Sequence, residues 1–319
     1  MGARRRAPVS FEKGEMDYLL IQMLNGVQLG LLMFLLAAGL TLTFGIMDLV
    51  NLAHGSLYMM GAYLAWTLIG WTDSFVLGAL LSLPATFLLG VVVERVVARR
   101  LYARDHLDQV LATFGLILFF NELVRAVWGP AGKSIAVPAF LSHTVEILPG
   151  VPYPAYRFAL IVVGIAVALL LAWLVARTRL GMLIRAGASN RRMIAALGVN
   201  IELLFSLVFG LGAVFAGLAG LMAAPISSVK IGMGDDILIL AFVIIVIGGI
   251  GSIKGAFVAA MIVGQIDIVG RAFLPDLLKT FMAPAAASGA APAISQVLVY
   301  IVMAGVLVWR PTGLFGQRQ

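Results

Sequence analysis

The chain has 319 residues, of which 62% are hydrophobic and only 12% are charged, and its mean hydropathy is +1.06. This balance excludes a soluble protein of this size and indicates a membrane protein with many spans. The apolar runs lack the alternation of a transmembrane β-barrel, so we expect an all-α polytopic helical bundle. The formal charge of +7 is interpreted as orientation signals between spans, not as a nucleic-acid surface.

The apolar runs predict about eight spans and one irregular stretch, because a hydrocarbon core of about 30 Å needs roughly 20 helical residues. The spans cover residues 18–44, 75–97, 109–128, 157–176, 203–224, 236–251, 255–272 and 293–309. We expect a broken or re-entrant helix over 45–71. The domain division is an N-terminal tail (1–17), a transmembrane domain (18–310) and a C-terminal tail (311–319).

Three arginine clusters orient these spans. The clusters are Arg95 with Arg99, Arg100 and Arg104, then Arg177 to Arg192, then Arg310 with Arg318. Even numbers of spans separate the clusters, so all three share one face, which the positive-inside rule assigns to the cytoplasm. Loop 129–156 is then external, and its four prolines favour irregular structure. The N-terminus is cytoplasmic if 45–71 re-enters the membrane and external if it crosses; we favour the cytoplasmic side.

Segment 45–63, GIMDLVNLAHGSLYMMGAY, places polar residues between uncharged spans. Polar groups at membrane depth are costly unless they are paired or face water. One interpretation is a broken helix that lines a solute path. The other is a short cytoplasmic loop in which Asp48 and Asn51 cap the next helix. We favour the path, because 56–70 is apolar but short for a full span.

Segment 177–200, RTRLGMLIRAGASNRRMIAALGVN, holds five arginines and no acid. Ser189 is expected to cap a short helix, with Met193, Ile194 and Leu197 on one face and Gly198 at its end. Such a helix either contacts a partner or lies in the headgroup region. The residues alone leave both interpretations open.

Several smaller features have structural explanations. Glu122 with Arg125 and Asp267 with Arg271 have the spacing of local ion pairs. Asp267 is also the natural candidate for a proton or ion carrier, since it lies far inside a late span. GGIGSIKGA (248–256) lacks the order of a phosphate loop and predicts a tight turn. Small residues spaced for close helix contact are Gly26 and Gly30, Ala213 and Gly217, Ala216 and Gly220, and Gly251 and Gly255.

The chain has no cysteine, and its three histidines show no metal-ligand spacing. No catalytic motif such as H-E-x-x-H or G-x-S-x-G is present. We therefore expect no enzyme activity, no metal and no cofactor.

Four motifs in a fixed order resemble one known family. They are residues 25–63, residues 185–200 with FGLGAVFAGLAGLMAAP (209–225), GGIGSIKGA, and the tail WRPTGLFG (309–316). The most specific piece is N-x-A-H-G over 51–55, followed by Gly61-Ala62-Tyr63. On these residues the chain resembles the permease subunits of bacterial ABC importers for branched-chain amino acids, specifically the LivH-type half.

The resemblance implies an inner-membrane permease driven by ATP hydrolysis in separate subunits. The implied partners are a LivM-like second permease, two cytoplasmic ATPase subunits and a periplasmic amino-acid-binding protein. It makes 177–200 the segment that couples to the ATPase, through Arg185, Ala186, Met193, Leu197 and Gly198. We expect Asn51, His54 and Gly55 to shape the translocation path.

The chain departs from the family at one place. Family members often carry acids shortly after the Arg-Ala pair, where this chain has Ser189, Asn190, Arg191 and Arg192. The loop should therefore favour a more acidic groove on its partner.

Two alternatives to this function remain. One is an ABC permease for another small solute, such as other amino acids, amides or urea. The other is a stand-alone secondary transporter, which would need an intramembrane acid; only Asp48 and Asp267 qualify. The second alternative leaves the basic segment unexplained.

Overall fold

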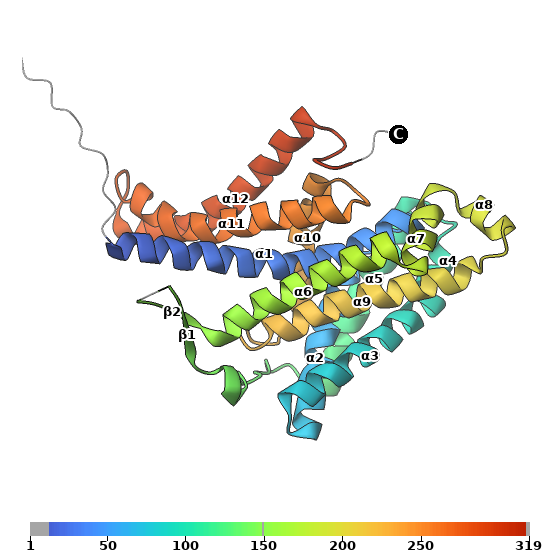
Figure 1. Cartoon of the computed structure of the whole chain (residues 1–319), viewed down its shortest axis with the longest axis horizontal. Coiled ribbons are helices and arrows are strands. Elements are labelled where there is room, and N and C mark those ends of the chain that lie inside the picture. The colour runs from blue at the N-terminus through green and yellow to red at the C-terminus, as the bar shows by residue number, and fades with distance from the viewer. Residues whose placement is uncertain (1–12, 149, 317–319) are drawn as a thin grey trace, which may run out of the picture.

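The computed structural model describes residues 13–148 and 150–316, and it confirms the all-α polytopic bundle (Figure 1). The eight predicted spans appear as α1 (Lys13–Met47), α3 (Phe75–Val93), α5 (His106–Trp128), α6 (Ala155–Arg177), α9 (Ile201–Ala223), α10 (Met233–Gly248), α11 (Ile253–Leu278) and α12 (Pro284–Trp309). Seven helices in the described part, α10 not among them, are long and apolar enough to cross a membrane. Residues 13–17 of the expected N-terminal tail form the start of α1.

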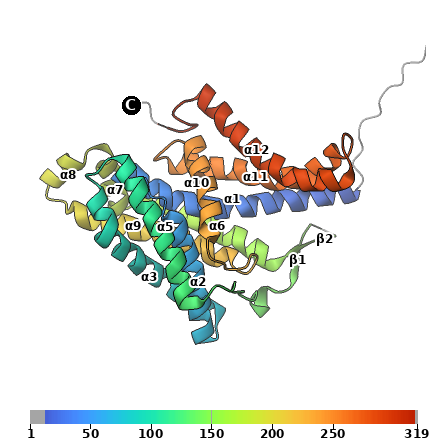
Figure 2. The ribbon, with the colours of Figure 1, turned by 180° about the vertical axis from the view of Figure 1, so that it is seen from behind.

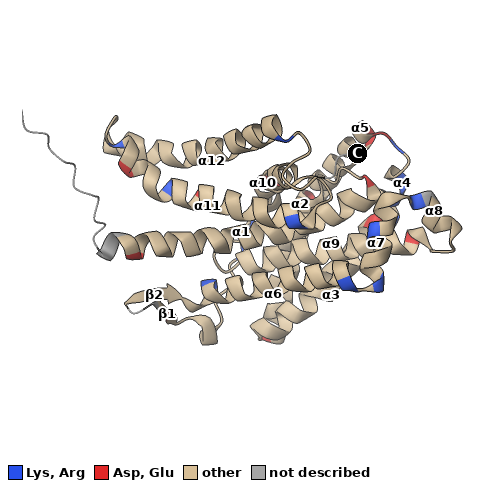
Figure 3. Ribbon diagram, turned by 45° about the horizontal axis from the view of Figure 1, so that its top comes forward, with Lys and Arg blue, Asp and Glu red and all other residues tan. Residues whose placement is uncertain are grey.

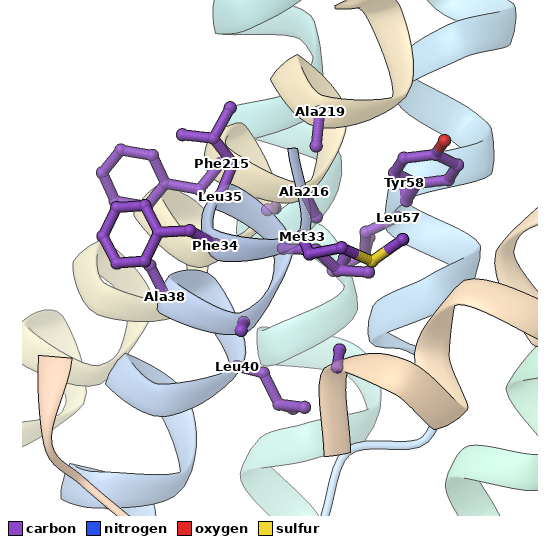
Figure 4. Packing of buried hydrophobic residues seen from close by; sticks show 14 of the residues in the cluster. Met33, Phe34, Leu35, Ala38, Leu40, Leu57, Tyr58, Phe215, Ala216 and Ala219 are labelled. Atoms are coloured by element: carbon purple, nitrogen blue, oxygen red, sulfur yellow. The ribbon is translucent and has the colours of Figure 1, made fainter. Parts of the chain in front are cut away.

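Helix α1 is the centre of the bundle. Its residues 31–43 are all buried, and α6, α9, α10 and α11 pack around it. In Figure 4, Phe34 and Leu35 of α1 lie beside Phe215 of α9, and Leu57 comes from α2 (His54–Thr72). A helix that is apolar on all sides is expected in such a central position.

The bundle has two ends, named here for what they carry. The basic end carries a π-helical turn η1 (Glu94–Ala98), α4 (Arg99–Leu101), α7 (Arg179–Ser189), α8 (Arg191–Ala196) and the tail 310–316. Lysine and arginine gather there in Figure 3, and α8 projects furthest from the bundle in Figures 1 and 2. The hairpin end carries a single-turn helix η2 (Ala139–Leu141) and the strands β1 (Thr144–Leu148) and β2 (Val151–Pro154).

The two strands pair antiparallel, with an irregularity between Glu146 and Leu148. We expected irregular structure over 129–156, and this hairpin was not predicted. Pro152 and Pro154 suit it because the hairpin has only two strands, so each has an edge that needs no N–H donor.

Helix α1 runs opposite to the direction that we favoured. Near its start, Asn25 Oδ1 accepts hydrogen bonds from Tyr153 (3.0 Å) and Arg157 (2.8 Å), so α1 begins at the hairpin end. Near its end, the Tyr102 hydroxyl lies 3.6 Å from Met47 Sδ at the basic end. The expected placement of the N-terminus beside the arginine clusters was therefore wrong for the start of α1, and residues 1–12 lie outside the described residues.

The cause is segment 45–71, which crosses the bundle instead of re-entering. Asp48 adopts a left-handed conformation (φ +53°), and the chain turns back inward. Val50 is held by α5, since its N–H donates to Gln109 (3.0 Å) and its carbonyl accepts from Thr113 (3.4 Å). Helix α2 then continues to the hairpin end, where Trp128 donates to Thr67 (2.8 Å). The irregular stretch is thus only the short break 48–53, followed by a regular helix.

The small residues fit the expected close contacts. Gly30 packs on the backbone of Ala260, and a Cβ there would lie 2.8 Å from its carbonyl oxygen. Gly217 meets Gly61, and the turn before α11 is closed by Gly255 against Gly248. These contacts let backbones approach where lipid supplies no hydrophobic force between helices.

Candidate functional site

Four helices meet in the middle of the bundle through glycines. We name Gly39 of α1, Gly55 of α2, Gly212 of α9 and Gly234 of α10 the glycine junction. A Cβ at Gly39 would lie 2.6 Å from the Gly212 carbonyl oxygen and 2.8 Å from His54 Nε2, and side chains at Gly55 or Gly234 would overlap the opposite backbone. At Gly39, Gly55 and Gly234 only glycine fits this approach.

Helices α2 and α10 both begin at the glycine junction. Each follows a non-helical segment, 48–53 before α2 and 224–232 before α10. Non-helical backbone at membrane depth is tolerated only where protein or a cavity surrounds it. The N-terminal ends of the two helices therefore bring two positive dipole ends into the interior.

The polar side chains of the first break are buried at this place. Asn51 is 1% exposed, and His54 is fully buried. Within the described residues, Asn51 Nδ2 and both ring nitrogens of His54 lack a hydrogen bond of normal geometry. Buried polar groups without partners are rare and costly, and they concentrate at functional positions.

The structure therefore brings Asn51, His54 and Gly55 together in the interior. They do not lie in a surface loop, and neither Asp48 nor Asn51 caps α2, because its cap position is Ala53 without a side-chain bond. The role of these residues in a solute path stays a prediction.

The basic loop, residues 177–200, folds as two helices instead of one. Thr178 Oγ1 accepts the Gly181 N–H at the start of α7 (3.1 Å), and Asn190 Oδ1 accepts the Met193 N–H at the start of α8 (3.0 Å). Ser189 was expected to be the cap, but it is the last residue of α7, and Asn190 has the extended backbone of a cap. Gly198, with φ +85°, ends α8 as predicted.

The apolar side chains of α8 and of Leu197, the residue directly after it, differ in exposure. Met193 is 64% exposed and Leu197 is 77% exposed, whereas Ile194 is 6% exposed. The predicted apolar face of three residues therefore contains only Met193 and Leu197, because Ile194 is buried and fixes α8 to the bundle. Two exposed apolar side chains on the most projecting helix are available to a partner.

The remaining predicted coupling residues lie on α7. Arg185 is exposed, and its guanidinium donates to the Val175 carbonyl near the end of α6. Ala186 is half-buried on the same helix. Arg185 thus fastens α7 to α6 and leaves α8 to project beyond it.

A buried carboxylate behind the basic loop was missed by the sequence analysis. Glu94 of η1 accepts hydrogen bonds from Arg99 (3.2 Å), Tyr102 (3.1 Å) and Ser206 (2.6 Å). Arg99 also pairs with Glu202 of α9 at 2.8 Å. Burial, with the Glu94 carboxylate beside it, raises the pKa of the Tyr102 hydroxyl, so this phenol stays protonated and donates.

We name Glu94, Arg99, Tyr102, Glu202 and Ser206 the Glu94 cluster. It joins the ends of α3 and α9 next to the basic loop. Its partners lie up to 112 residues apart in the chain, so spacing could not reveal it. The single available signal was Glu94, the one acid among the valines and arginines of VVVERVVARR (91–100).

Both predicted local ion pairs form. Glu122 and Arg125 pair at 2.8 Å, and Arg271 binds Asp267 Oδ1 through Nε (2.9 Å) and Nη2 (2.8 Å). Asp267 is therefore paired with an arginine one turn along the same helix.

The C-terminal tail lies against the turn after α10. Leu314 N–H donates to the Ile247 carbonyl (2.8 Å), and Phe315 N–H donates to the Gly248 carbonyl (3.0 Å). The predicted tight turn is present, with Gly249 and Gly251 at positive φ. The tail thus occupies carbonyls that a helix end leaves unpaired.

Together these features define a polytopic membrane protein with a broken-helix interior and an exposed apolar pair on a basic loop. Residues 22–307 match the family described as the branched-chain amino acid transport system / permease component, and the chain belongs to this family.

Curated relatives of this family cover nearly the whole chain. The chain is 29% identical over 317 residues to the high-affinity branched-chain amino acid transport system permease protein BraD of Pseudomonas aeruginosa, covering 95% of this chain and 97% of the relative. It is 28% identical to the corresponding permease proteins LivH of Escherichia coli strain K12 and Salmonella typhimurium, each covering 94% of this chain and 96% of the relative. No solved structure matches at a significant level.

Proposed function

We propose that this chain is a permease subunit of an ABC importer and forms part of the path for branched-chain amino acids. Its implied partners are a LivM-like second permease, two ATPase subunits and an amino-acid-binding protein. Family membership supplies the class of protein. The observation that carries ATP coupling is the pair Met193 and Leu197, exposed on the helix that projects furthest at the basic end.

The basic end faces the cytoplasm of a bacterial inner membrane in this proposal. Arginines of the basic loop and of the connection 94–105 lie at this end, as the positive-inside rule requires of short cytoplasmic connections. The hairpin end then faces the binding protein, and α1 begins outside. The tail 310–316 shares the cytoplasmic face with the ATPase subunits.

Coupling runs from the basic loop into the bundle. Met193 and Leu197 enter an apolar groove on an ATPase subunit, and the surrounding arginines favour an acidic rim. Only three residues, 197–199, separate the end of α8 from Asn200, whose side chain caps α9 through the Leu203 N–H (2.9 Å). Displacement of α8 is therefore passed to α9, which the Glu94 cluster joins to the end of α3.

Helix α9 carries Gly212, so the same displacement reaches the glycine junction. There Gly39 of α1 packs on the backbone of Gly212 of α9, and Gly55 of α2 packs on that of Gly234 of α10; the His54 ring of α2 contacts Gly39 and links the two pairs. A shift of one helix must move its neighbours, because close-packed contacts cannot deform continuously. Alternating access follows if ATP binding favours one arrangement of the junction and hydrolysis favours the other.

Proteoliposomes test this function directly. They would hold this chain with its partner subunits, ATP on the side of the basic end, and the binding protein with labelled leucine on the other side. We expect uptake that needs ATP and is competed by isoleucine and valine. Uptake without the ATPase subunits would show a secondary transporter, and competition only by amides, urea or other amino acids would show a different solute.

A further inference from the structure

A pocket of about 510 Å³ opens between α1, α10, α11 and α12, beside the start of α10 and away from the basic loop. This volume lies within the range of small-molecule sites, about 300–1,000 Å³. Its lining combines charged Asp236 and Arg271, polar Gln296 and Tyr300, and apolar residues that include Ile237 and Leu240. The pocket thus offers charged, polar and apolar side chains to a ligand.

The pocket lies inside the membrane-spanning region. Asp236 is in the first turn of α10, which begins at the glycine junction. Ser295 of α12 donates to the Ile266 (3.1 Å) and Asp267 (3.0 Å) carbonyls of α11, so this level of α12 lies beside the middle of α11. Charged side chains at such a depth are costly toward lipid, so this face belongs toward water or protein.

Arg271 and Asp236 each have polar atoms free to bind a ligand group of the opposite charge. Arg271 uses Nε and Nη2 on Asp267, which leaves the N–H groups of Nη1 to bind an anion. Asp236 is exposed, and within the described residues its carboxylate has neither a hydrogen bond nor an ion-pair partner. An acid and an arginine beside an apolar wall match an α-amino acid with an aliphatic side chain.

We propose that this pocket is the amino-acid site of the subunit. Arg271, positioned by Asp267, binds the α-carboxylate; Asp236 binds the α-ammonium; and Ile237, Leu240 and Met33 contact the side chain. The site rests on the proposed function, because it deepens the assignment of a branched-chain amino acid permease.

A single cysteine reports occupancy cleanly, since the chain has none of its own. In the assembled transporter without binding protein, a water-soluble thiol reagent should label Gln296→Cys, and leucine should slow this labelling. A Ser142→Cys variant at the hairpin end should label at the same rate with or without leucine.

The charges are tested in the Gln296→Cys background. Asp236→Asn and Arg271→Gln should each raise the half-protecting leucine concentration by about tenfold or more, the value of a charge-assisted hydrogen bond. Asp276→Asn and Arg125→Gln are matched controls, because both residues form exposed ion pairs at the hairpin end.

Ligands that lack one charge sharpen the assignment. Protection by 4-methylpentanoate, which has no ammonium group, should be insensitive to Asp236→Asn. Protection by 3-methylbutylamine, which has no carboxylate, should be insensitive to Arg271→Gln. The opposite pairing would overturn the assigned roles.

The experiments distinguish a wrong assignment of the pocket from a wrong proposed function. If wild-type proteoliposomes take up leucine with ATP but leucine never protects Gln296→Cys, the pocket is not the site. If protection is lost because either charge variant no longer assembles with the second permease, the pocket is a subunit contact and the proposal is overturned. Absence of ATP-driven leucine uptake in the wild type would refute the proposed function itself.

Discussion

Replacing Met193 and Leu197 together with aspartate should detach the ATPase subunit and leave the bundle intact. Fully burying one such side chain contributes about 1.5–3 kcal/mol. Scaled by exposures of 64% and 77%, the pair can contribute about 2–4 kcal/mol to docking. Its loss corresponds to about 30- to 700-fold weaker association. Aspartate would add repulsion from the acidic groove that we expect on the partner.

The assay is titration of purified permease with ATPase subunit, read as copurified ATPase at each concentration. The matched control, Met193→Leu with Leu197→Met, keeps the apolar surface and should bind normally. Ile194→Asp is the opposite control: Ile194 is 6% exposed, so this change should lower the yield of folded chain instead. Undiminished copurification of the double aspartate variant would refute docking through α8.

Three further predictions concern the interior. Asn51→Leu and His54→Leu should each reduce leucine uptake by about tenfold or more. Assembly should persist, because removing unpaired buried polar groups costs the fold little. Normal uptake by both variants would show that these residues have a structural role only. Gly55→Ala should cost about 1–3 kcal/mol through overlap with Gly234, measured by thermal unfolding in detergent against Gly115→Ala, where nothing lies within 4 Å. Glu94→Gln should cost about 1–3 kcal/mol by weakening the Glu94 cluster, and an unchanged unfolding temperature would count against that role.

Hydropathy predicted seven of the eight spans, because a helix that crosses the hydrocarbon core needs about 20 apolar residues. The eighth, 236–251, corresponds to α10, which has only 16 residues and begins inside the bundle. Hydropathy did not predict the direction in which α1 runs through the bundle. That direction depended on whether 45–71 crosses, and the decisive contacts, Tyr153 to Asn25 and Trp128 to Thr67, join residues far apart in the chain. Charge could not decide the matter either, since the first 17 residues mix bases and acids.

The candidate sites were predicted unevenly for a similar reason. Local chemistry identified the basic loop, the end of α8 at Gly198 and the ion pair of Asp267 with Arg271, because each depends on neighbours within a few residues. The glycine junction, the Glu94 cluster and the pocket at Asp236 depend on contacts between separate helices. Spacing within one helix carries no information about such contacts.

The attachment of the tail to α10 has a practical consequence for truncation experiments. A chain shortened at Arg310 would lose the Leu314 and Phe315 donors and strand the carbonyls of Ile247 and Gly248. Since α10 also brings Gly234 and Asp236 to the interior, unravelling its last turn would disturb groups about 20 Å away, at 1.5 Å per helical residue. Loss of transport in a truncated protein is therefore explained first by a destabilised α10. It does not by itself show that the tail binds a partner.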